Sequence, residues 1–304
     1  MQACPPVLIL AFNRPDTTAR VFEALRGVKP PRLFFAVDGP RPDKPDDAQR
    51  VAKVRELAAT VDWPCDTKVL FRDRNLGCKI AVSQAITWFF EQVEEGIVME
   101  DDCVPHPSFF RFAGELLERY RQDERVMAIS ADNFLRGDCA TPYSYYFSRY
   151  LHIWGWATWR RAWRLYDHGM RQWPELKDRG WLLDLLGDRA EASYWTQIFD
   201  DTHGERNSSW GYRWIFSAWR EKGLSINPSV NLVSNIGFGD SATHTVQHEN
   251  PLAGLPIQPM AFPLHHPPQV VRDEEADLYT QRNLFSGPGG WRSVASRVRN
   301  FLRR

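Results

Sequence analysis

The sequence predicts an α/β protein with a mixed, mostly parallel sheet flanked by helices, followed by a C-terminal extension. Over residues 7–99, short apolar runs alternate with amphipathic stretches of helical length. Parallel strands that are buried on both faces read as continuous apolar runs. Each run also ends in a short polar turn, and this alternation of strands and helices is typical of a doubly wound sheet.

Four strands and the helices between them account for this region. Val7–Phe12 is the first expected strand, closed by the turn Asn13-Arg14-Pro15, and Asp16 or Thr17 is expected to cap the next helix. After the fourth strand, Ser108 is the expected N-cap of another apolar-periodic helix. The remaining expected strands are Leu33–Val37, Thr67–Phe71 and Gly96–Met99, and the remaining helices cover Val51–Ala58 and Ile80–Val93.

Polar residues stand at the carboxyl end of each of these strands. In doubly wound sheets, ligands bind at that edge. The residues are Asn13 and Arg14 after the first strand, Asp38 after the second, Asn75 to Gly77 after the third, and Glu100, Asp101 and Asp102 after the fourth. Because four polar turns converge on one edge, the sequence predicts a binding site there.

The acid triplet Glu100-Asp101-Asp102 is the central element of this expected site. Adjacent carboxylates repel one another, so clustering them at a strand tip is costly unless a cation lies among them. Carboxylate oxygens, completed by water and phosphate, are the usual ligands of Mg²⁺ and Mn²⁺. The alternative is a solvated acidic turn that binds nothing.

Composition narrows the class of protein. Lys plus Arg and Asp plus Glu number 38 each, so no global charge argues for a nucleic-acid partner. The five cysteines lack metal-ligand or redox spacing, which predicts reduced thiols in a cytoplasmic protein. We expect no signal peptide and no membrane span. Neither G-x-G-x-x-G nor a P-loop pattern follows the first strand, which argues against dinucleotide binding and P-loop phosphoryl transfer.

From Val126 onward, the sequence no longer shows the regular alternation of expected strands and helices. Val126–Ser130 is an expected strand, and the aromatic block Tyr143–Trp163 contains four of the thirteen Trp. Aromatic faces stack on sugar rings but also fill cores, and both interpretations stay open. The polar segment Asn231–Thr245 is long for a connection and is predicted to be a functional lid. Helices are expected over residues 182–186, 194–199 and 210–219, with a short strand at 224–226.

Residues 1–250 are expected to form one domain, and residues 251–304 an extension. The extension begins with a proline-punctuated segment and ends in Trp291–Arg304, an expected helix with one apolar face and five arginines opposite. Such a helix suits an anionic membrane surface, which would place the protein at the inner face of the cell membrane. The alternative is a helix docked on the domain with its arginines in solvent.

Taken together, these motifs resemble a known family. The turn Asn13-Arg14-Pro15, Asp38, Asn75-Leu76-Gly77, and the acid triplet followed by Pro105 are similar to those of GT-A-fold glycosyltransferases. Ile153-Trp154-Gly155-Trp156 and the segment Ser234–Thr245 add to the resemblance, which covers roughly residues 7–245. The closer match is to bacterial hemolytic-protein-like sugar transferases, and a more distant one is to N-acetylglucosaminyltransferase I.

The resemblance implies a GT-A-like transferase that uses a nucleotide-sugar donor, with UDP as the expected nucleotide. It would pass a hexosyl or N-acetylhexosaminyl group to a glycan or lipid-linked glycan, as in polysaccharide biosynthesis. Asp102 would bind Mn²⁺ or Mg²⁺ directly, and His244 is a candidate second ligand. The implied donor-binding residues are Ala11, Phe12, Asn13, Arg14, Asp38, Asn75, Gly77, Lys79, Glu100, Asp101 and Asp102. The implied acceptor-binding residues are Trp154, Gly155, Trp156, Trp210 and Tyr212.

One position departs from the family pattern. Relatives of this type commonly carry an acid in a Trp-acid-x-x-Trp segment, as the base that deprotonates the acceptor hydroxyl. This chain has Gly211 at that place, and glycine has no side chain for the task. Asp240 is our candidate for the catalytic base, ahead of Glu205 and Asp201. Two other functions stay open: a catalytically silent sugar-binding module, and a nucleotidyltransferase, which usually needs a glycine- and basic-rich loop after the first strand.

Overall fold

The structure, a computed structural model, describes residues 4–137, 141–238, 252 and 255–285. The expected lid residues Asp240 and His244, and the expected helix Trp291–Arg304, lie outside the described residues. Along the ranges that are described, no helix has the length and apolar character needed to span a membrane.

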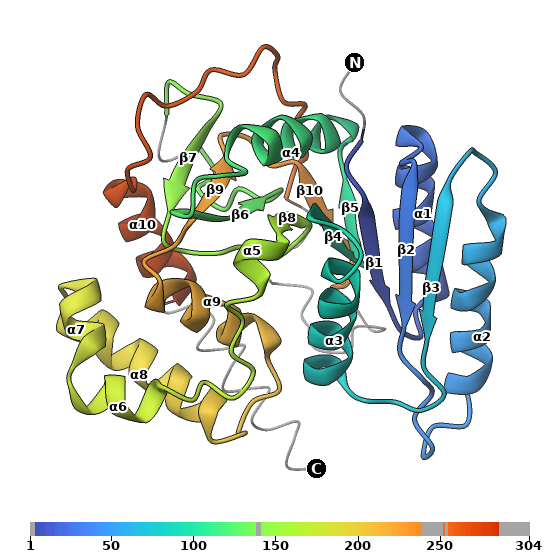
Figure 1. Ribbon diagram of the computed structural model, residues 1–304, viewed down its shortest axis with the longest axis horizontal. Coiled ribbons are helices and arrows are strands. Elements are labelled where there is room, and N and C mark those ends of the chain that lie inside the picture. The colour runs from blue at the N-terminus through green and yellow to red at the C-terminus, as the bar shows by residue number, and fades with distance from the viewer. Residues whose placement is uncertain (1–3, 138–140, 239–251, 253–254, 286–304) are drawn as a thin grey trace.

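Strands and helices alternate in the N-terminal part of the chain, and most of the helices gather in the second half (Figure 1). The strands are β1 Val7–Ala11, β2 Arg32–Val37, β3 Asp66–Phe71, β4 Glu95–Glu100, β5 Cys103–Pro105, β6 Val126–Ser130, β7 Tyr145–Ser148, β8 Trp156–Trp159, β9 Leu224–Pro228 and β10 Val233–Asn235. The helices are α1 Pro15–Val28, α2 Asp47–Leu57, α3 Cys78–Phe90, α4 Pro107–Arg119, α5 Arg160–Trp163, α6 Trp173–Asp178, α7 Trp181–Leu186, α8 Arg189–His203, α9 Trp210–Arg220 and α10 Glu274–Thr280, with the short turns η1 Ala58–Thr60 and η2 Gln281–Phe285.

Eight strands form one sheet in the order β3-β2-β1-β4-β8-β6-β9-β7. β1 pairs in parallel with β2 and β4, β2 with β3, and β6 with β9, whereas β8 is antiparallel to both β4 and β6, and β7 to β9. The predicted mixed, mostly parallel sheet is therefore confirmed. Since β4 and β6 both run opposite to β8, their carboxyl ends share one edge with those of β1, β2 and β3.

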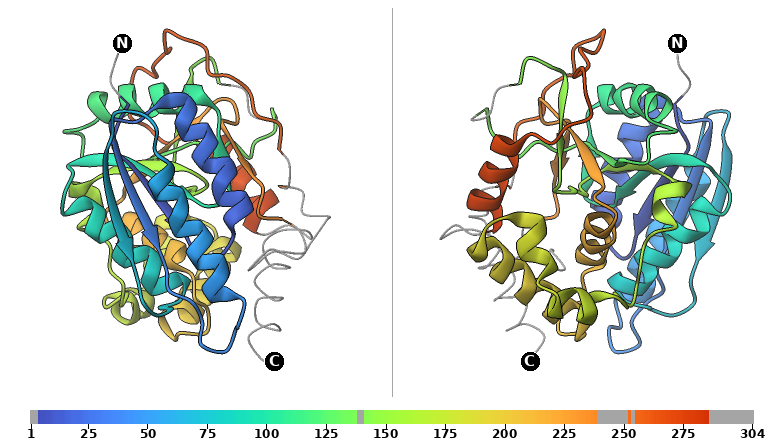
Figure 2. Two further views of the ribbon diagram at one scale, coloured as in Figure 1. Left: turned by 90° about the vertical axis from the view of Figure 1, so that its right-hand side faces the viewer. Right: turned by 60° about the vertical axis from the view of Figure 1, so that its left-hand side comes forward.

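Alternating side chains build a core on each face of the sheet. In β1, Val7 and Ile9 pack with α1, α2 and α4 on one face, while Leu8 and Leu10 pack with α3 and α9 on the other. Figure 2 shows α1 and α2 lying in front of strands β1 to β3. Because helices cover both faces, β1 is apolar throughout rather than at every second residue.

Tryptophans fill the core under the second half of the sheet. Trp156, Trp163, Trp210 and Trp214 pack against one another, with ring centroids 5.3–6.5 Å apart. Other nearly fully buried members of this core are Trp173, Trp195 and Trp219, whereas Trp159 packs on the opposite face of the sheet. Of the two interpretations of the Trp-rich block, packing is the right one for these residues.

Two helix starts differ from the sequence-based expectation. α1 begins at Pro15, not after Asp16 or Thr17, because the fixed φ of proline suits the first helical position. α4 is capped by His106, whose Nδ1 accepts a hydrogen bond from the Ser108 N–H at 3.1 Å. The prediction that Ser108 is the N-cap was therefore wrong. Its Oγ instead accepts a hydrogen bond from the Met260 N–H at 3.0 Å.

The sequence did not predict β5, β7, β8 and β10. β7 and β8 lie inside the aromatic block. Apolar residues at consecutive positions there obscure the alternation of apolar and polar residues that marks a strand. β10 lies inside the expected lid and pairs antiparallel with β5, placing Asn235 opposite Cys103. Part of the expected loop is thus a strand, fixed beside the residue that follows the acid triplet.

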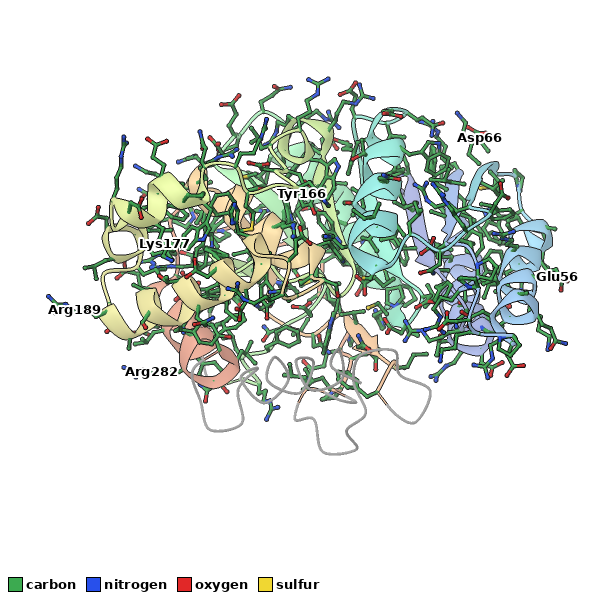
Figure 3. All side chains as sticks on the ribbon, turned by 90° about the horizontal axis from the view of Figure 1, so that it is seen from below. Glu56, Asp66, Tyr166, Lys177, Arg189 and Arg282 are labelled. Atoms are coloured by element: carbon green, nitrogen blue, oxygen red, sulfur yellow. The ribbon has the colours of Figure 1, made fainter. Side chains whose placement is uncertain are left out.

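The view from below shows two ends of the molecule, with the sheet running between them (Figure 3). Glu56 of α2 and Asp66 of β3 lie at one end, and Lys177 of α6 and Arg189 of α8 lie at the other. β4 is fourth among the eight strands. The acid triplet at its carboxyl end therefore lies between the two ends.

Candidate functional site

Arg14 joins the turn after β1 to the acid triplet after β4. Its guanidinium forms an ion pair with Asp101 and a second one, at 3.0 Å, with Asp102 Oδ2. The backbone N–H of Phe12 donates to Asp101 Oδ2 at 3.3 Å. Asp101 and Asp102 are only 3% and 8% exposed. The two turns therefore converge, as the sequence predicts, and they bury two carboxylates against one cation.

Burial dominates the electrostatics of the triplet. Burial, and after it the charges of Asp102 and Asp101, raise the pKa of Glu100 to about 8. Burial also raises the pKa of Asp101 to about 6, although the charge of Arg14 acts to lower it. Burial acts to lower the pKa of Arg14, but the attraction of Asp101 and Asp102 outweighs it and the pKa is raised. Three acidic residues thus share one cation. The group is short of positive charge, and a divalent ion would supply it.

A ribbon of two strands, β5 and β10, adjoins the triplet. The N–H of Ile236 donates to the backbone carbonyl of Asp102 at 2.8 Å. A β-carbon at Gly237 would lie 2.0 Å from Asp102 Oδ2 and 3.0 Å from Arg14 Nη1. Glycine is therefore required where this segment passes over the carboxylate.

Among the described residues, the side chains of Glu100, Asp102 and Cys103 form a group that could hold a metal ion. One ligand atom from each residue lies within 4.8 Å of the others. Buried carboxylates that are short of positive charge fit a divalent cation. Glu100 and Asp102 would bind such an ion through carboxylate oxygens.

Asp38 organises a second group, made of the turns after β2 and β3. Its carboxylate accepts hydrogen bonds from Asn75 Nδ2 and from the backbone N–H groups of Leu76 and Gly77, at 3.0–3.2 Å. Gly77 has a φ of 76°, a left-handed conformation that glycine adopts without strain, and it precedes α3. Asp38 therefore fixes this turn, and its expected role in donor binding stays a prediction.

Gly39→Ala is expected to lower the free energy of unfolding by about 1–3 kcal/mol. A β-carbon at residue 39 would lie 2.3 Å from the backbone carbonyl carbon of Arg74, where the two turns cross. Chemical denaturation would measure the loss. The control is Gly27→Ala on the exposed side of α1, where no atom lies within 4 Å of the new β-carbon. Gly27→Ala should be neutral or stabilising by up to about 1 kcal/mol, and equal losses in both variants would contradict the account.

Some predicted donor-binding residues have partners elsewhere. Asn13 Nδ2 donates to Asp47 Oδ1 at 2.7 Å, which ties the turn to the start of α2. Lys79, in the first turn of α3, forms an ion pair with Glu205. The Ala11 carbonyl accepts from the Asp38 N–H at 3.1 Å and so links the two groups. The structure thus brings Phe12 and Arg14 to the triplet, but not the side chains of Asn13 and Lys79.

The three predicted acceptor-binding tryptophans differ in their burial and in their neighbours. Trp156 is 0% exposed and stacks on Trp210, so its ring packs in the core, and its contact with an acceptor stays a prediction. Trp210 is also buried, but its side chain lies close enough to the Glu100 carboxylate to act against the rise of its pKa, which places α9 beside the triplet. Trp154 is half-buried, and its ring meets Phe238 edge-on with centroids 5.5 Å apart. Trp154 is therefore next to the segment that covers Asp102.

Gly155 and Tyr212, the other two expected acceptor residues, have packing roles. Gly155 has a φ of 68°, and a β-carbon there would lie 3.1 Å from Met99 Cε. Tyr212 is half-buried, with its ring edge-on to Trp195 at 6.2 Å. Burial raises the pKa of Tyr212 to about 12, so its hydroxyl stays protonated at neutral pH. A contact of either residue with an acceptor stays a prediction.

Gly211, the position that lacks the acid, is packed against a neighbouring side chain. Gly211 lies in the first turn of α9, where a β-carbon would be 2.9 Å from Ile153 Cδ1. A carboxylate would therefore fit only if Ile153 moved. The two alternative bases have cationic partners: Asp201 pairs with Arg206, and Glu205 pairs with Lys79 and Arg213.

Cys103 is the candidate site residue that sequence reasoning missed. Its position directly after the triplet was the available signal, but a lone cysteine beside an apolar residue also reads as core. Burial, and after it the charge of Asp102, raise the pKa of the Cys103 thiol well above its ordinary value. The position of Trp210 beside Glu100 was also missed, because no local pattern relates residues so far apart in sequence.

Comparisons with known proteins assign no family to this chain. No protein-family model matches it, and no curated protein matches it. HddC from Yersinia pseudotuberculosis is similar over 52% of this chain and 77% of its own, at 13% identity and a TM-score of 0.32. An inositol-1-phosphate CTP transferase from T. maritima is similar over 54% and 75%, at 11% identity and a TM-score of 0.27. UDP-glucose pyrophosphorylase, solved with UDP-glucose, is similar over 47% and 62%, at 11% identity and a TM-score of 0.25. The chain is distantly similar to these proteins, and the scores are too low to assign it an activity.

Proposed function

We propose that this chain is a metal-dependent glycosyltransferase that moves a sugar from a UDP-sugar to a hydroxyl of a glycan or lipid-linked glycan. The observation that carries the proposal is the burial of Asp101 and Asp102, beside Glu100, against the single guanidinium of Arg14. Such a group lacks positive charge. A divalent ion bridging a diphosphate would supply it, and the sequence resemblance to GT-A-fold glycosyltransferases indicates the class of donor.

Different residues of the chain would have different roles in the reaction. When bound, a divalent ion would stabilise the negative charge that develops on the departing nucleoside diphosphate. Glu100 and Asp102 would hold that ion, and Arg14 keeps Asp102 Oδ2 fixed in place. Gly237 lets the segment after β10 lie directly over the carboxylates. Trp154, in contact with Phe238 of that segment, would border the acceptor.

Nucleotidyl transfer is the second candidate. Arg14 places a cation at the tip of β1 beside the acids, where a nucleoside triphosphate would need one. A further group of cations would be expected for a triphosphate, yet the turn after β1 contributes only Arg14. A catalytically silent sugar-binding module is the remaining alternative, since Gly211 supplies no base.

A panel of substrates separates these functions. The full-length chain with Mn²⁺ would be incubated with UDP-, GDP- and dTDP-sugars, and separately with nucleoside triphosphates and sugar 1-phosphates. A glycosyltransferase should cleave one nucleotide-sugar slowly and release no pyrophosphate from triphosphates. Pyrophosphate release without nucleotide-sugar cleavage would establish nucleotidyl transfer instead, and sugar binding without either reaction would establish a silent module.

Divalent-ion binding is expected to strengthen as pH rises from about 6 to about 8. Burial raises the pKa values of Asp101 and Glu100 to about 6 and about 8, and ligands must be ionised to bind a cation. Affinity for Mn²⁺, measured by calorimetry, should therefore rise in this window by about tenfold per pH unit for each proton that binding releases. Without the ion, the folded chain retains protons that the unfolded chain releases, so the free energy of unfolding should fall as pH rises from roughly 4.5 towards 8. A flat pH profile of Mn²⁺ affinity would contradict this.

Asp240→Asn is expected to lower turnover while leaving donor binding intact. Asp240 is the proposed base because position 211 offers no acid and the alternatives Asp201 and Glu205 are paired with cations. Loss of a general base typically costs about 10²–10⁴-fold in rate. Donor cleavage and transfer would be measured alongside UDP affinity, and unchanged turnover would exclude Asp240 from this role.

A further inference from the structure

Cys103 lies beside the two carboxylates proposed to hold the ion. Its side chain is 0% exposed, and its thiol donates a hydrogen bond to Asp102 Oδ1 with an Sγ–Oδ1 distance of 3.4 Å. The other oxygen of this carboxylate, Oδ2, is paired with Arg14 at 3.0 Å. Oδ1, the oxygen that is not paired with Arg14, is therefore the one next to the sulfur. The sulfur and the oxygens of Glu100 and Asp102 form the one group of this kind within the described ranges.

The separations suit three ligands of one ion. Sulfur and oxygen ligands that lie about 2.0–2.3 Å from a shared ion are roughly 3.3–3.7 Å apart at tetrahedral angles. The 3.4 Å between Asp102 Oδ1 and Cys103 Sγ is in that interval. The ligand atom of Glu100 lies within 4.8 Å of both. Because the thiol is fully buried, an ion would reach it from the side of the carboxylates.

A hydrogen-bond donor already faces the sulfur. Asn235 is opposite Cys103 in the β5–β10 ribbon, and its Nδ2 donates to Sγ at 3.8 Å. The amide is held in this orientation because its Oδ1 accepts from the Gly237 N–H at 2.8 Å. A neutral thiol is a weak acceptor, whereas a metal-bound thiolate is stabilised by such a donor.

We propose that Cys103 is a metal ligand, so that the site selects Zn²⁺ or Co²⁺ ahead of Mn²⁺, and Mn²⁺ ahead of Mg²⁺. Thiolate is a soft ligand that favours such ions, whereas Mg²⁺ prefers oxygen alone. The proposal rests on the proposed function for the position of the ion. On binding, the S–H bond is replaced by a metal–sulfur bond, and the proton goes to solvent.

Charge balance is consistent with this exchange. The three acids, when ionised, and Arg14 together carry a net charge of −2 while the thiol is protonated. A divalent ion with a thiolate ligand changes this to −1. The buried group therefore comes closer to neutrality even though the thiol has lost its proton.

Cobalt spectroscopy tests the proposal without any substrate. The full-length, metal-free chain would be titrated with Co²⁺, and the sulfur-to-cobalt charge-transfer absorption would be followed in the near ultraviolet. The band should appear in the wild type and be lost in Cys103→Ser, with at least a tenfold loss of Co²⁺ affinity and little change for Mg²⁺. Cys78→Ser is the matched control, because Cys78 is another thiol close enough to Glu100 and Asp101 to feel their charge.

A second measurement covers the case in which Cys103→Ser fails to fold. X-ray absorption at the zinc edge of the wild-type chain should show a sulfur neighbour at about 2.3 Å. A zinc shell without sulfur, a band that survives in Cys103→Ser, or a band lost only in Cys78→Ser would overturn the proposal. The proposed function is tested separately: UDP binding with Mn²⁺ that persists without a sulfur ligand would reject only the role of Cys103. A sulfur ligand without UDP binding would reject only the nucleotide role.

Discussion

Asp102→Asn is expected to weaken Mn²⁺-dependent binding of UDP by about 100-fold or more. Loss of a residue that merely supports a metal ligand costs about 10–100-fold in metal affinity, and loss of a direct ligand should cost at least as much. The amide keeps the size of the carboxylate but carries no charge, and it also leaves Arg14 with Asp101 as its remaining acidic partner. Calorimetric titration of UDP in Mn²⁺ would measure the effect.

The control for this variant is Asp184→Asn, which makes the same chemical change on the exposed side of α7. It should bind UDP and Mn²⁺ like the wild type. Thermal melts of both variants would show whether the fold survives. Wild-type UDP affinity in a folded Asp102→Asn variant would show that the metal site is not where we place it.

Gly237→Ala is expected to weaken Mn²⁺ binding by about 10–100-fold, although residue 237 is not itself a proposed ligand. The new β-carbon would lie 2.0 Å from Asp102 Oδ2 and 2.8 Å from its Cγ, so the carboxylate must move. Arg14 Nη1, at 3.0 Å, restricts the direction of that movement. Mn²⁺ affinity would be measured by calorimetry or by the electron paramagnetic resonance of free Mn²⁺.

Gly169→Ala is the matched control, since it adds the same methyl group to an exposed glycine that also lies outside helices and strands. Its nearest neighbour would be Arg171 Cγ at 3.5 Å, an ordinary contact. We expect no change in Mn²⁺ affinity there. Equal affinities in Gly237→Ala and Gly169→Ala would mean that the segment after β10 does not confine Asp102.

The N-terminal half of the fold and the convergence of its turns could be predicted from the sequence. In β1, β2 and β4 the residues are apolar because helices cover both faces, and such runs are visible without any long-range information. The topology of parallel strands then places their carboxyl ends on one edge. The contact between Arg14 and the acid triplet follows from that rule, but its geometry does not.

The features that escaped prediction depend on distant packing. β5 and β10 are each three residues long, and neither has a recognisable pattern until Cys103 pairs with Asn235. The Trp-rich block offered two interpretations that composition cannot separate, because an aromatic ring in a core and one on a sugar-binding surface have the same sequence. The stacking of Trp156 on Trp210, from two different elements, decides between them for these residues.

The central claim is that the acid triplet binds a nucleotide through a divalent ion. Its most direct test is calorimetric titration of UDP into the full-length chain, first with Mn²⁺ and then after the ion is removed with EDTA. The account predicts saturable binding with Mn²⁺ that disappears on chelation and returns when Mn²⁺ is restored. UDP binding of equal strength in EDTA, or none in saturating Mn²⁺, would contradict it.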